Sequence, residues 1–341
     1  MKTVDEFRQL FDKELMPHLK GLEGRRKSIN SRMNVVWIVG GLIVVSPVFI
    51  GLMRAVVTLS EGIGGSVFAG ASCCFCSGFI SLPVGLLLIA ICNHFLKRGY
   101  VEDYKAEVIG KVVKFMDEGL TYEPKGGIQP SAYHESQLFL TKPDRFHSED
   151  HVKGKVGRTD LEFSEVCTEY KTESEDMDGH TETQWHTIFR GIFFVADFNK
   201  DFRGRTLVLP DTAQKAFGGL IGSFFQGHTS GRPDLVKMED PEFEKLFVVY
   251  GTDQVEARYI LSPALMQRMA EFRDKTGKNV YFSFTGNRIM VAVPYKKNLF
   301  EPSMSKSTME FDQVRPYFED LQLIIGIADE LNLNTRIWGK Q

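Results

Sequence analysis

Two long apolar segments near the N-terminus limit what this chain can fold into more than any other feature. They extend from Val35 to Met53 and from about Phe75 to Phe95, and neither contains Lys, Arg, Asp or Glu. At a helical rise of about 1.5 Å per residue, each is long enough to cross a hydrocarbon layer of about 30 Å. The sequence therefore predicts a hairpin of two transmembrane helices that carries a soluble region.

The charged residues around the two segments predict the orientation of this hairpin. Lys and Arg are concentrated outside it, whereas the connection contains only Arg54. The flanking cations are Arg25, Arg26, Lys27 and Arg32 before the first segment and Lys97, Arg98 and Lys105 after the second. Because cationic flanks stay in the cytoplasm, we expect both termini there. Acidic residues before the first segment, such as Asp5 and Glu6, argue against a cleaved signal peptide.

Small residues recur at every fourth position into the second apolar segment, where helical spacing places them on one stripe. These residues are Ala69, Cys73, Ser77, Ser81 and Gly85. Small side chains allow close backbone approach between helices in lipid, so the stripe predicts helix packing within the chain or self-association. The spans contain no ionisable group at mid-membrane that would favour a transport path over an anchor.

The remainder of the chain predicts an α+β region. Alternating patterns between about Ser131 and Pro210 indicate an antiparallel meander, which closes into a partial barrel if Gly191 or Gly204 serves as a bulge. Mixed helix and strand signals follow. Ser262 is expected to cap a helix that Gly277 ends, Thr285-Gly286-Asn287 is expected to join a hairpin, and a last helix is expected from about Phe311 to Leu333. The predicted regions are an amphipathic cytoplasmic helix (1–34), two transmembrane helices (35–95), a stalk helix (96–122) and a cytoplasmic α+β domain (131–341), taken either whole or as a β unit (131–210) and an α+β unit (211–341).

Composition excludes several classes of protein. The net charge of -3, with 25% charged and 43% hydrophobic residues, excludes a disordered chain and a strongly basic nucleic-acid binder. Four of the five cysteines lie in or beside the second apolar segment, so Cys167 has no disulfide partner in the soluble region and a reducing compartment is indicated. Cys73, Cys74 and Cys76 lack a second ligand pair for a metal, and small-residue packing is the preferred interpretation.

Four stretches of the soluble region resemble a known family. They are Gly191 to Lys200, Gly204 to Thr206, Asp240 to Lys245 and Asp253 to Leu261. Together with the two early spans and the C-terminal helix, they are similar to a bacterial membrane-protein family known as domain of unknown function 3137. The resemblance implies a protein of the bacterial cytoplasmic membrane and carries over no catalytic residue and no cofactor.

Two patterns resemble metal sites. Asp197, Asn199 and Asp201 imitate the first ligands of a calcium loop, but Phe202 and Val208 replace the required glycine and glutamate. A turn between strands is the preferred interpretation. His147 and His151 are four residues apart in a segment expected to be a loop, without the metalloprotease pattern between them. The sequence therefore predicts no metal site.

The remaining candidates for catalysis are Asp197, Asp253, Glu256 and Arg258. Carboxylates beside an arginine can perform acid-base chemistry if they are buried together. Glu256 and Arg258 are two positions apart, which on a strand places them on one face, so a structural ion pair is the preferred interpretation.

Two functions are compatible with these features. The preferred one is a membrane-tethered interaction or scaffold module with a protein partner and no nucleic acid. The alternative is a membrane-bound, hydrolase-like enzyme that uses the candidate carboxylates, which requires a pocket where at least two of them converge.

Overall fold

A computed structural model describes residues 2–60, 66–175, 181–198, 200–212, 233–331 and 333, although only some side chains between 44 and 82 are described. The chain forms two compact units. The hairpin unit comprises Phe11–Tyr104 and Pro302–Gln313, and the latter segment is called the strap below. The sheet unit comprises Met1–Leu10, Lys105–Glu301 and Val314–Gln341.

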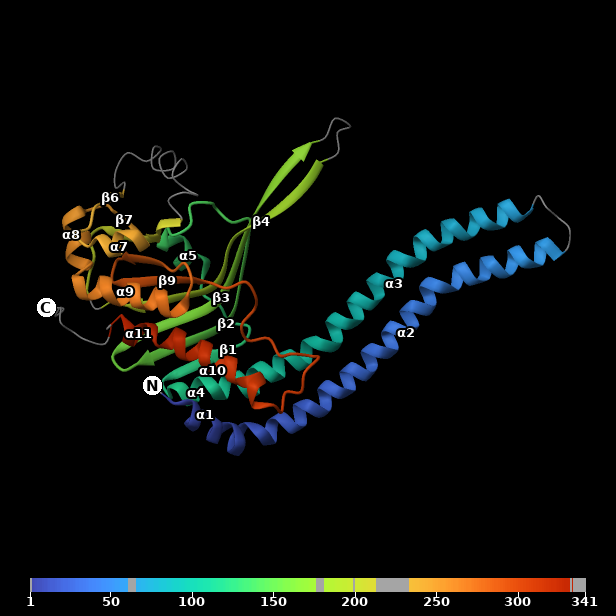
Figure 1. Ribbon diagram of the computed structural model, residues 1–341, viewed down its shortest axis with the longest axis horizontal. Helices are drawn as coiled ribbons and strands as arrows, with labels where there is room; N and C mark the ends of the chain where they lie inside the picture. The colour runs from blue at the N-terminus through green and yellow to red at the C-terminus, as the bar shows by residue number, and fades with distance from the viewer. Residues whose placement is uncertain are drawn as a thin grey trace. The chain divides into compact units, whose positions relative to one another are not determined.

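Two long antiparallel helices make up most of the hairpin unit (Figure 1). They are α2 (Met16–Ser60) and α3 (Ser66–Tyr104), and the π-helix η1 (Phe11–Leu15) precedes α2. Arg25 and Asp103 form an ion pair, so the two helices also run side by side beyond the apolar segments. Glu23 and Arg26 are buried and bonded to each other, and they also bind the strap through Thr308 and Met304.

The N-terminal helix buries a different residue from the one its periodicity predicts. Phe7 lies on α1 (Val4–Leu10) in the sheet unit, where it stacks on Phe318 with ring centroids 4.4 Å apart. The sequence predicts one buried helical face made of Phe7, Phe11, Leu15, His18 and Leu22. The structure buries Leu19 in place of His18, which is exposed. The extra residue per turn in η1 explains the shift, because a π-helical turn advances a stripe more slowly than an α-helical one.

An open antiparallel sheet of nine described strands forms the centre of the sheet unit (Figure 1). Its order is β1-β2-β3-β4-β9-β8-β5-β7-β6. The strands are β1 (Leu120–Glu123), β2 (Arg145–Val156), β3 (Thr159–Glu175), β4 (Thr181–Asp197), β5 (Arg205–Pro210), β6 (Asp234–Val236), β7 (Phe247–Gly251), β8 (Tyr281–Thr285) and β9 (Arg288–Pro294). The described helices of this unit include η2 (Lys105–Ile109), α4 (Gly110–Met116), α5 (Pro130–Ser136), α7 (Pro241–Leu246), α8 (Gln254–Ile260), α9 (Pro263–Thr276), α10 (Phe311–Ile325, which begins in the strap) and α11 (Ile327–Glu330).

The α+β class is confirmed, but the partial barrel is wrong. β4 pairs with β9, and β5 pairs with β7 and β8, so the strands before and after Pro210 belong to one open sheet. The bulge in β4 is at Ile188 rather than at Gly191 or Gly204, because Thr187 and Phe189 oppose consecutive residues of β3. Gly191 has another role: at φ 153°, a Cβ there would lie 2.1 Å from the Val293 carbonyl oxygen of β9.

In the C-terminal half, the residues predicted to begin and end helices and turns do so in the structure. Ser262 caps α9 by accepting from the Leu265 amide, and Gly277 ends it at φ 61°. A two-residue turn that includes Gly286 joins β8 to β9. The last predicted helix is present but is divided at Gly326 into α10 and α11. Residues 120–122, expected to end the stalk helix, instead belong to β1 at the sheet edge.

Candidate functional sites

An exposed apolar surface covers the middle of the hairpin unit, and we call it the apolar belt. Leu42 on α2 is 64% exposed and Phe95 on α3 is 68% exposed. The belt comprises Val35, Trp37, Ile38, Val39, Leu42, Ile43, Val45, Phe49 and Met53 on α2 and Val84, Leu86, Leu87, Leu88, Ile91 and Phe95 on α3. So many exposed apolar side chains on two helices are rarely left to water, so the belt is expected to meet lipid or another apolar surface.

A helix long and apolar enough to cross a membrane is found within the described residues, from Pro83 to Met116. Only 17% of its most apolar stretch is buried, whereas the core helix of a water-soluble protein would be mostly covered. The first predicted span, Val35–Met53, lies on α2, where several side chains are outside the described residues. The structure thus contains one candidate span among the described residues, and the two-span hairpin remains a prediction.

A glycine contact joins α2 and α3 inside the belt. A Cβ on Gly40 would lie 2.5 Å from the Ile89 side chain and 3.9 Å from the Gly85 carbonyl oxygen. Of the predicted small-residue stripe, Gly85 is buried at this contact. The side chains of Ala69, Cys73, Ser77 and Ser81 lie outside the described residues, as do those of Cys74 and Cys76. Glycines let these two backbones approach closely.

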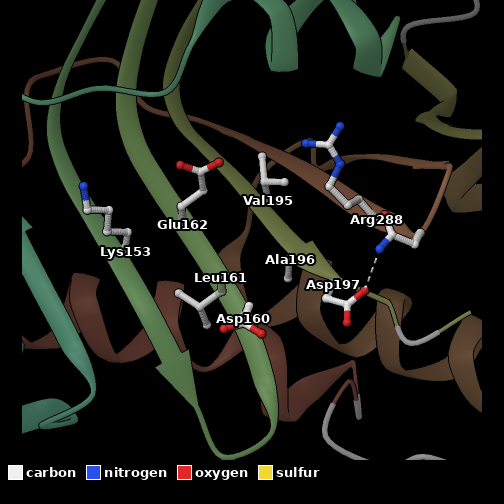
Figure 2. Close-up of a pocket in the computed structure, with 9 residues that line it drawn as sticks. Lys153, Asp160, Leu161, Glu162, Val195, Ala196, Asp197 and Arg288 are labelled. Atoms are coloured by element: carbon white, nitrogen blue, oxygen red, sulfur yellow. Dashed lines mark hydrogen bonds between the residues drawn. The ribbon is translucent and has the colours of Figure 1, made fainter.

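Asp197 lines a cavity of about 430 Å³ on the sheet (Figure 2). Its lining residues are Lys153, Asp160, Leu161, Glu162, Val195, Ala196, Asp197, Asn287 and Arg288. Three of these are carboxylates and two are cations, so the cavity is polar and mixed in charge. Asn287 donates to Asp197 at 3.3 Å, and Arg288 forms an ion pair with Glu135 of α5. The His151 ring bonds Glu162 at 2.9 Å and lowers the pKa of that carboxyl.

The other candidate residues lie away from this cavity, and their segment is a helix rather than a strand. Asp253 is the N-cap of α8 and accepts from the Val255 and Glu256 amides. Glu256 accepts from the backbone amides of Arg203 and Gly204, at 3.0 and 2.7 Å. Side chains two apart on a helix do not face each other, so the shared face expected for Glu256 and Arg258 is wrong.

Asp253, Glu256 and Arg258 therefore hold local backbone. Arg258 reaches the Lys237 carbonyl oxygen at 3.4 Å. Two further charged residues, Asp240 and Arg268, have similar roles. Asp240 caps α7, and Arg268 donates to the Glu330 carbonyl oxygen at 3.2 Å.

The structure also shows where the residues of the two patterns that resemble metal sites lie. His147 and His151 lie on β2 and not in a loop. His147 lies 3.6 Å from Glu149, whereas His151 bonds Glu162 on β3. Asn199 is outside the described residues, so the imitation calcium loop is described only in part.

The sheet unit contains a largely buried group of charged residues that was not predicted from the sequence. We call it the Lys105 cluster. Its members are Lys105, Tyr122, Glu149, Asp150, Glu165 and Glu301. Lys105 is 4% exposed and its ammonium lies 2.8 Å from Asp150, 2.8 Å from Glu301 and 3.3 Å from Glu149. Tyr122 donates to Asp150, which is 0% exposed.

A backbone irregularity aims Asp150 into this cluster. The register of β2 and β3 shifts between Glu149 and Val152, and Asp150 adopts a positive φ of 59°. Burial lowers the pKa of Lys105, but Asp150 and Glu301 more than offset this, so its pKa is raised. Burial raises the pKa of Asp150 against the opposing effect of Lys105. Lys105 therefore stays charged in the interior because its partners surround it.

Comparison with known proteins confirms the family resemblance over part of the chain. No curated protein matches the sequence. A crystal structure of the mycobacterial trehalose monomycolate transport factor A, TtfA, is similar at 12% identity and a TM-score of 0.31, covering 63% of this chain and 96% of that one. So low a score supports no argument about fold or function. Residues 187–333 match the family described as "Protein of unknown function (DUF3137)", the family that the sequence resembles.

Proposed function

We propose that this protein is a membrane-anchored interaction module whose α2–α3 hairpin spans the cytoplasmic membrane twice. The apolar belt is the observation that carries the proposal. Its described residues lie on both helices within the stretches that the sequence predicts to be spans, and they are exposed, unlike Gly85 and Ile89 at the contact between α2 and α3. Burying such side chains in hydrocarbon releases the free energy that their exposure to water would cost.

Residues at the end of the belt near the termini support the same placement. Trp37 on α2 and Phe95 on α3 are 53% and 68% exposed, as expected of aromatic residues at a membrane interface. Beyond them the exposed cations Arg25, Lys27 and Arg98 follow. These positions favour a cytoplasmic location for both termini and for the sheet unit.

Labelling of single cysteines in intact cells tests the topology. In a chain whose native cysteines are replaced, a cysteine at Glu242, 81% exposed on α7, should react with an impermeant maleimide only after lysis. A cysteine at Gly62, in the connection between the two predicted spans, should react before lysis. The reverse pattern would contradict the orientation, and equal labelling of both sites before lysis would contradict the membrane proposal.

We prefer an interaction role to an enzymatic one because most of the predicted catalytic residues have structural roles. Three of the four candidates, Asp253, Glu256 and Arg258, bond backbone groups that shape their own segment. Groups used in this way contribute to folding rather than to chemistry on a substrate. Membrane crosslinking with a photoreactive residue on the sheet unit would identify the proposed protein partner, and self-association through the hairpin would appear as a crosslink between copies.

The cavity beside Asp197 is the observation that favours an enzyme as a second candidate. Asp160, Glu162 and Asp197 all line it, so several carboxylates share one polar cavity. A panel of chromogenic ester and phosphoester substrates tests this role with the detergent-purified protein. If the wild type hydrolyses a substrate and Asp197→Asn abolishes this activity at an unchanged melting temperature, the enzyme becomes the preferred function. If the wild type shows no more turnover than the variant, the enzyme is excluded for these substrates.

A further inference from the structure

The segment from Asn298 to Glu301 is the connection through which the sheet unit leads into the strap. Glu301 is the last residue of the sheet unit in this part of the chain, and the strap of the hairpin unit begins at Pro302. Leu299 is 5% exposed and Phe300 is 0% exposed, so the segment is packed although it has no regular secondary structure. Whatever holds this segment holds one of the four places where the chain passes from one unit to the other.

Polar groups of the sheet unit hold every part of the segment. Glu165 of β3 accepts from the Leu299 amide at 3.0 Å. Lys105 forms an ion pair with the Glu301 carboxylate at 2.8 Å, and the Tyr317 hydroxyl donates to the Glu301 carbonyl oxygen at 2.8 Å. The Asn298 side chain is held by Arg190 and by Glu149, the latter at 3.5 Å.

Negative charge exceeds positive charge around Glu165. Glu149 and Asp150 face it from β2, and Lys105 faces it from η2 as the nearby cation. Glu301 and Tyr122 complete the surroundings, each bonded to a member of the cluster. When all of the acids are ionised, one ammonium therefore serves four carboxylates, those of Glu149, Asp150, Glu165 and Glu301. Close carboxylates in a buried site cannot all ionise without cost.

We propose that Glu165 is a pH-sensitive clamp on the segment from Asn298 to Glu301. In its neutral form it holds the Leu299 amide without adding charge. Its ionisation strengthens that one hydrogen bond but adds a negative charge opposite Glu149, and the repulsion among the crowded carboxylates loosens the segment. The inference concerns the sheet unit alone and does not depend on the proposed membrane role.

The electrostatics of the site support a response near neutral pH. Burial, assisted by Asp150 and Glu149, raises the pKa of Glu165 to about 7 against the opposing effects of the Leu299 amide and Lys105. Because the folded pKa lies above the ordinary value, the folded state binds this proton more tightly than the unfolded state. The stability from the neutral form is complete below about pH 4.5 and is lost as the pH rises through about 7.

Hydrogen exchange of the full-length protein in detergent tests the clamp. Amide exchange of the peptide containing residues 296–303 is compared between the wild type and Glu165→Gln at pH 6 and at pH 8. Glutamine keeps an oxygen for the Leu299 amide but cannot ionise. At each pH, the wild-type rate is divided by the Glu165→Gln rate, and this ratio cancels the intrinsic pH dependence of exchange. It should be near one at pH 6 and about threefold or more at pH 8, where the wild type is mostly ionised.

The matched control is Glu169→Gln, on the same strand, whose carboxylate lies 3.9 Å from the exposed Arg145. It should exchange like the wild type at both pH values. A ratio for Glu165→Gln that is equal at the two pH values, or an equal change in Glu169→Gln, would overturn the proposal. Failure of Glu165→Gln to fold would also count against it, because a neutral side chain of this shape is expected to keep the segment in place.

Discussion

At the scale of single residues, Lys105 shows how this fold keeps a charge in its interior. Its ammonium has three carboxylate partners, and Asp150 meets it only because a bulge in β2 turns that side chain inward. Desolvating an ammonium and a carboxylate costs several kcal/mol each, so the pair is tolerated because the partners stay together. Removing one partner is therefore more harmful than the modest net contribution of the pair suggests.

Replacing Lys105 by methionine should destabilise the sheet unit by about 3–5 kcal/mol, because it leaves Asp150 charged and uncompensated at 0% exposure. Chemical unfolding of the detergent-solubilised protein at neutral pH measures this change. The matched control is Lys153→Met, whose ammonium is 49% exposed and pairs with the exposed Glu123. That substitution should change the free energy of unfolding by less than about 1 kcal/mol. Equal effects of the two substitutions would show that burial of Lys105 is energetically unimportant.

At the scale of elements, α2 and α3 meet through glycines rather than through large side chains. Gly40 lies against Ile89, while the neighbouring Gly41 has no atom within 4 Å of where its Cβ would be. In lipid there is little hydrophobic drive for two helices to associate, so backbone approach and van der Waals contact supply the attraction. The hairpin should therefore tolerate bulk on one glycine and not on the next.

Gly40→Leu should weaken the contact between α2 and α3 by about 1–3 kcal/mol, the usual cost of inserting bulk into a packed site. Gly41→Leu makes the same chemical change one residue along, where there is open space. Thermal unfolding in detergent should show a lower melting temperature for Gly40→Leu alone. A lower melting temperature in both variants would mean that glycine is needed at both positions for the helix itself rather than for contact with Ile89.

At the scale of the whole molecule, exposed apolar residues of two kinds must be told apart. Leu42 and Leu87 of the apolar belt are 64% and 60% exposed, and Val255 on α8 is 76% exposed. Isolated apolar side chains on a surface are normal, whereas a continuous band on two adjacent helices is unusual in water. One exposed apolar residue therefore does not identify a membrane surface, whereas the many that are described on α2 and α3 favour one.

The double substitution of Leu42 and Leu87 by lysine should reduce insertion into membranes, because a lysine at the centre of a span costs roughly 2.5–3.5 kcal/mol. The two side chains are exposed within the hairpin unit, so their loss should disturb little packing. Alkaline extraction of cell membranes gives the fraction of inserted chain. Val255→Lys is the control and should stay fully inserted. A double variant that resists extraction like the wild type would contradict a lipid-facing belt.

Signals that act between neighbours in the sequence determined several features of this protein by themselves. The two apolar segments predicted long helices, and Ser262, Gly277 and the turn at Gly286 marked element ends that the structure confirms. Each depends on groups only a few residues apart, such as a hydroxyl and the amide it caps. The same reasoning failed where local preferences were balanced, as at Asp253, whose capping role turned an expected strand into α8.

Only the tertiary structure decided which strands share the sheet and which charges meet. β4 pairs with β9, although nearly a hundred residues separate the two in the sequence, so strands from both sides of Pro210 share one sheet. Lys105, Asp150, Glu165 and Glu301 come from four different segments of the chain, and none carries a local mark of burial. Helical periodicity and capping report interactions between near neighbours, whereas strand pairing and buried charge depend on partners that folding alone brings together.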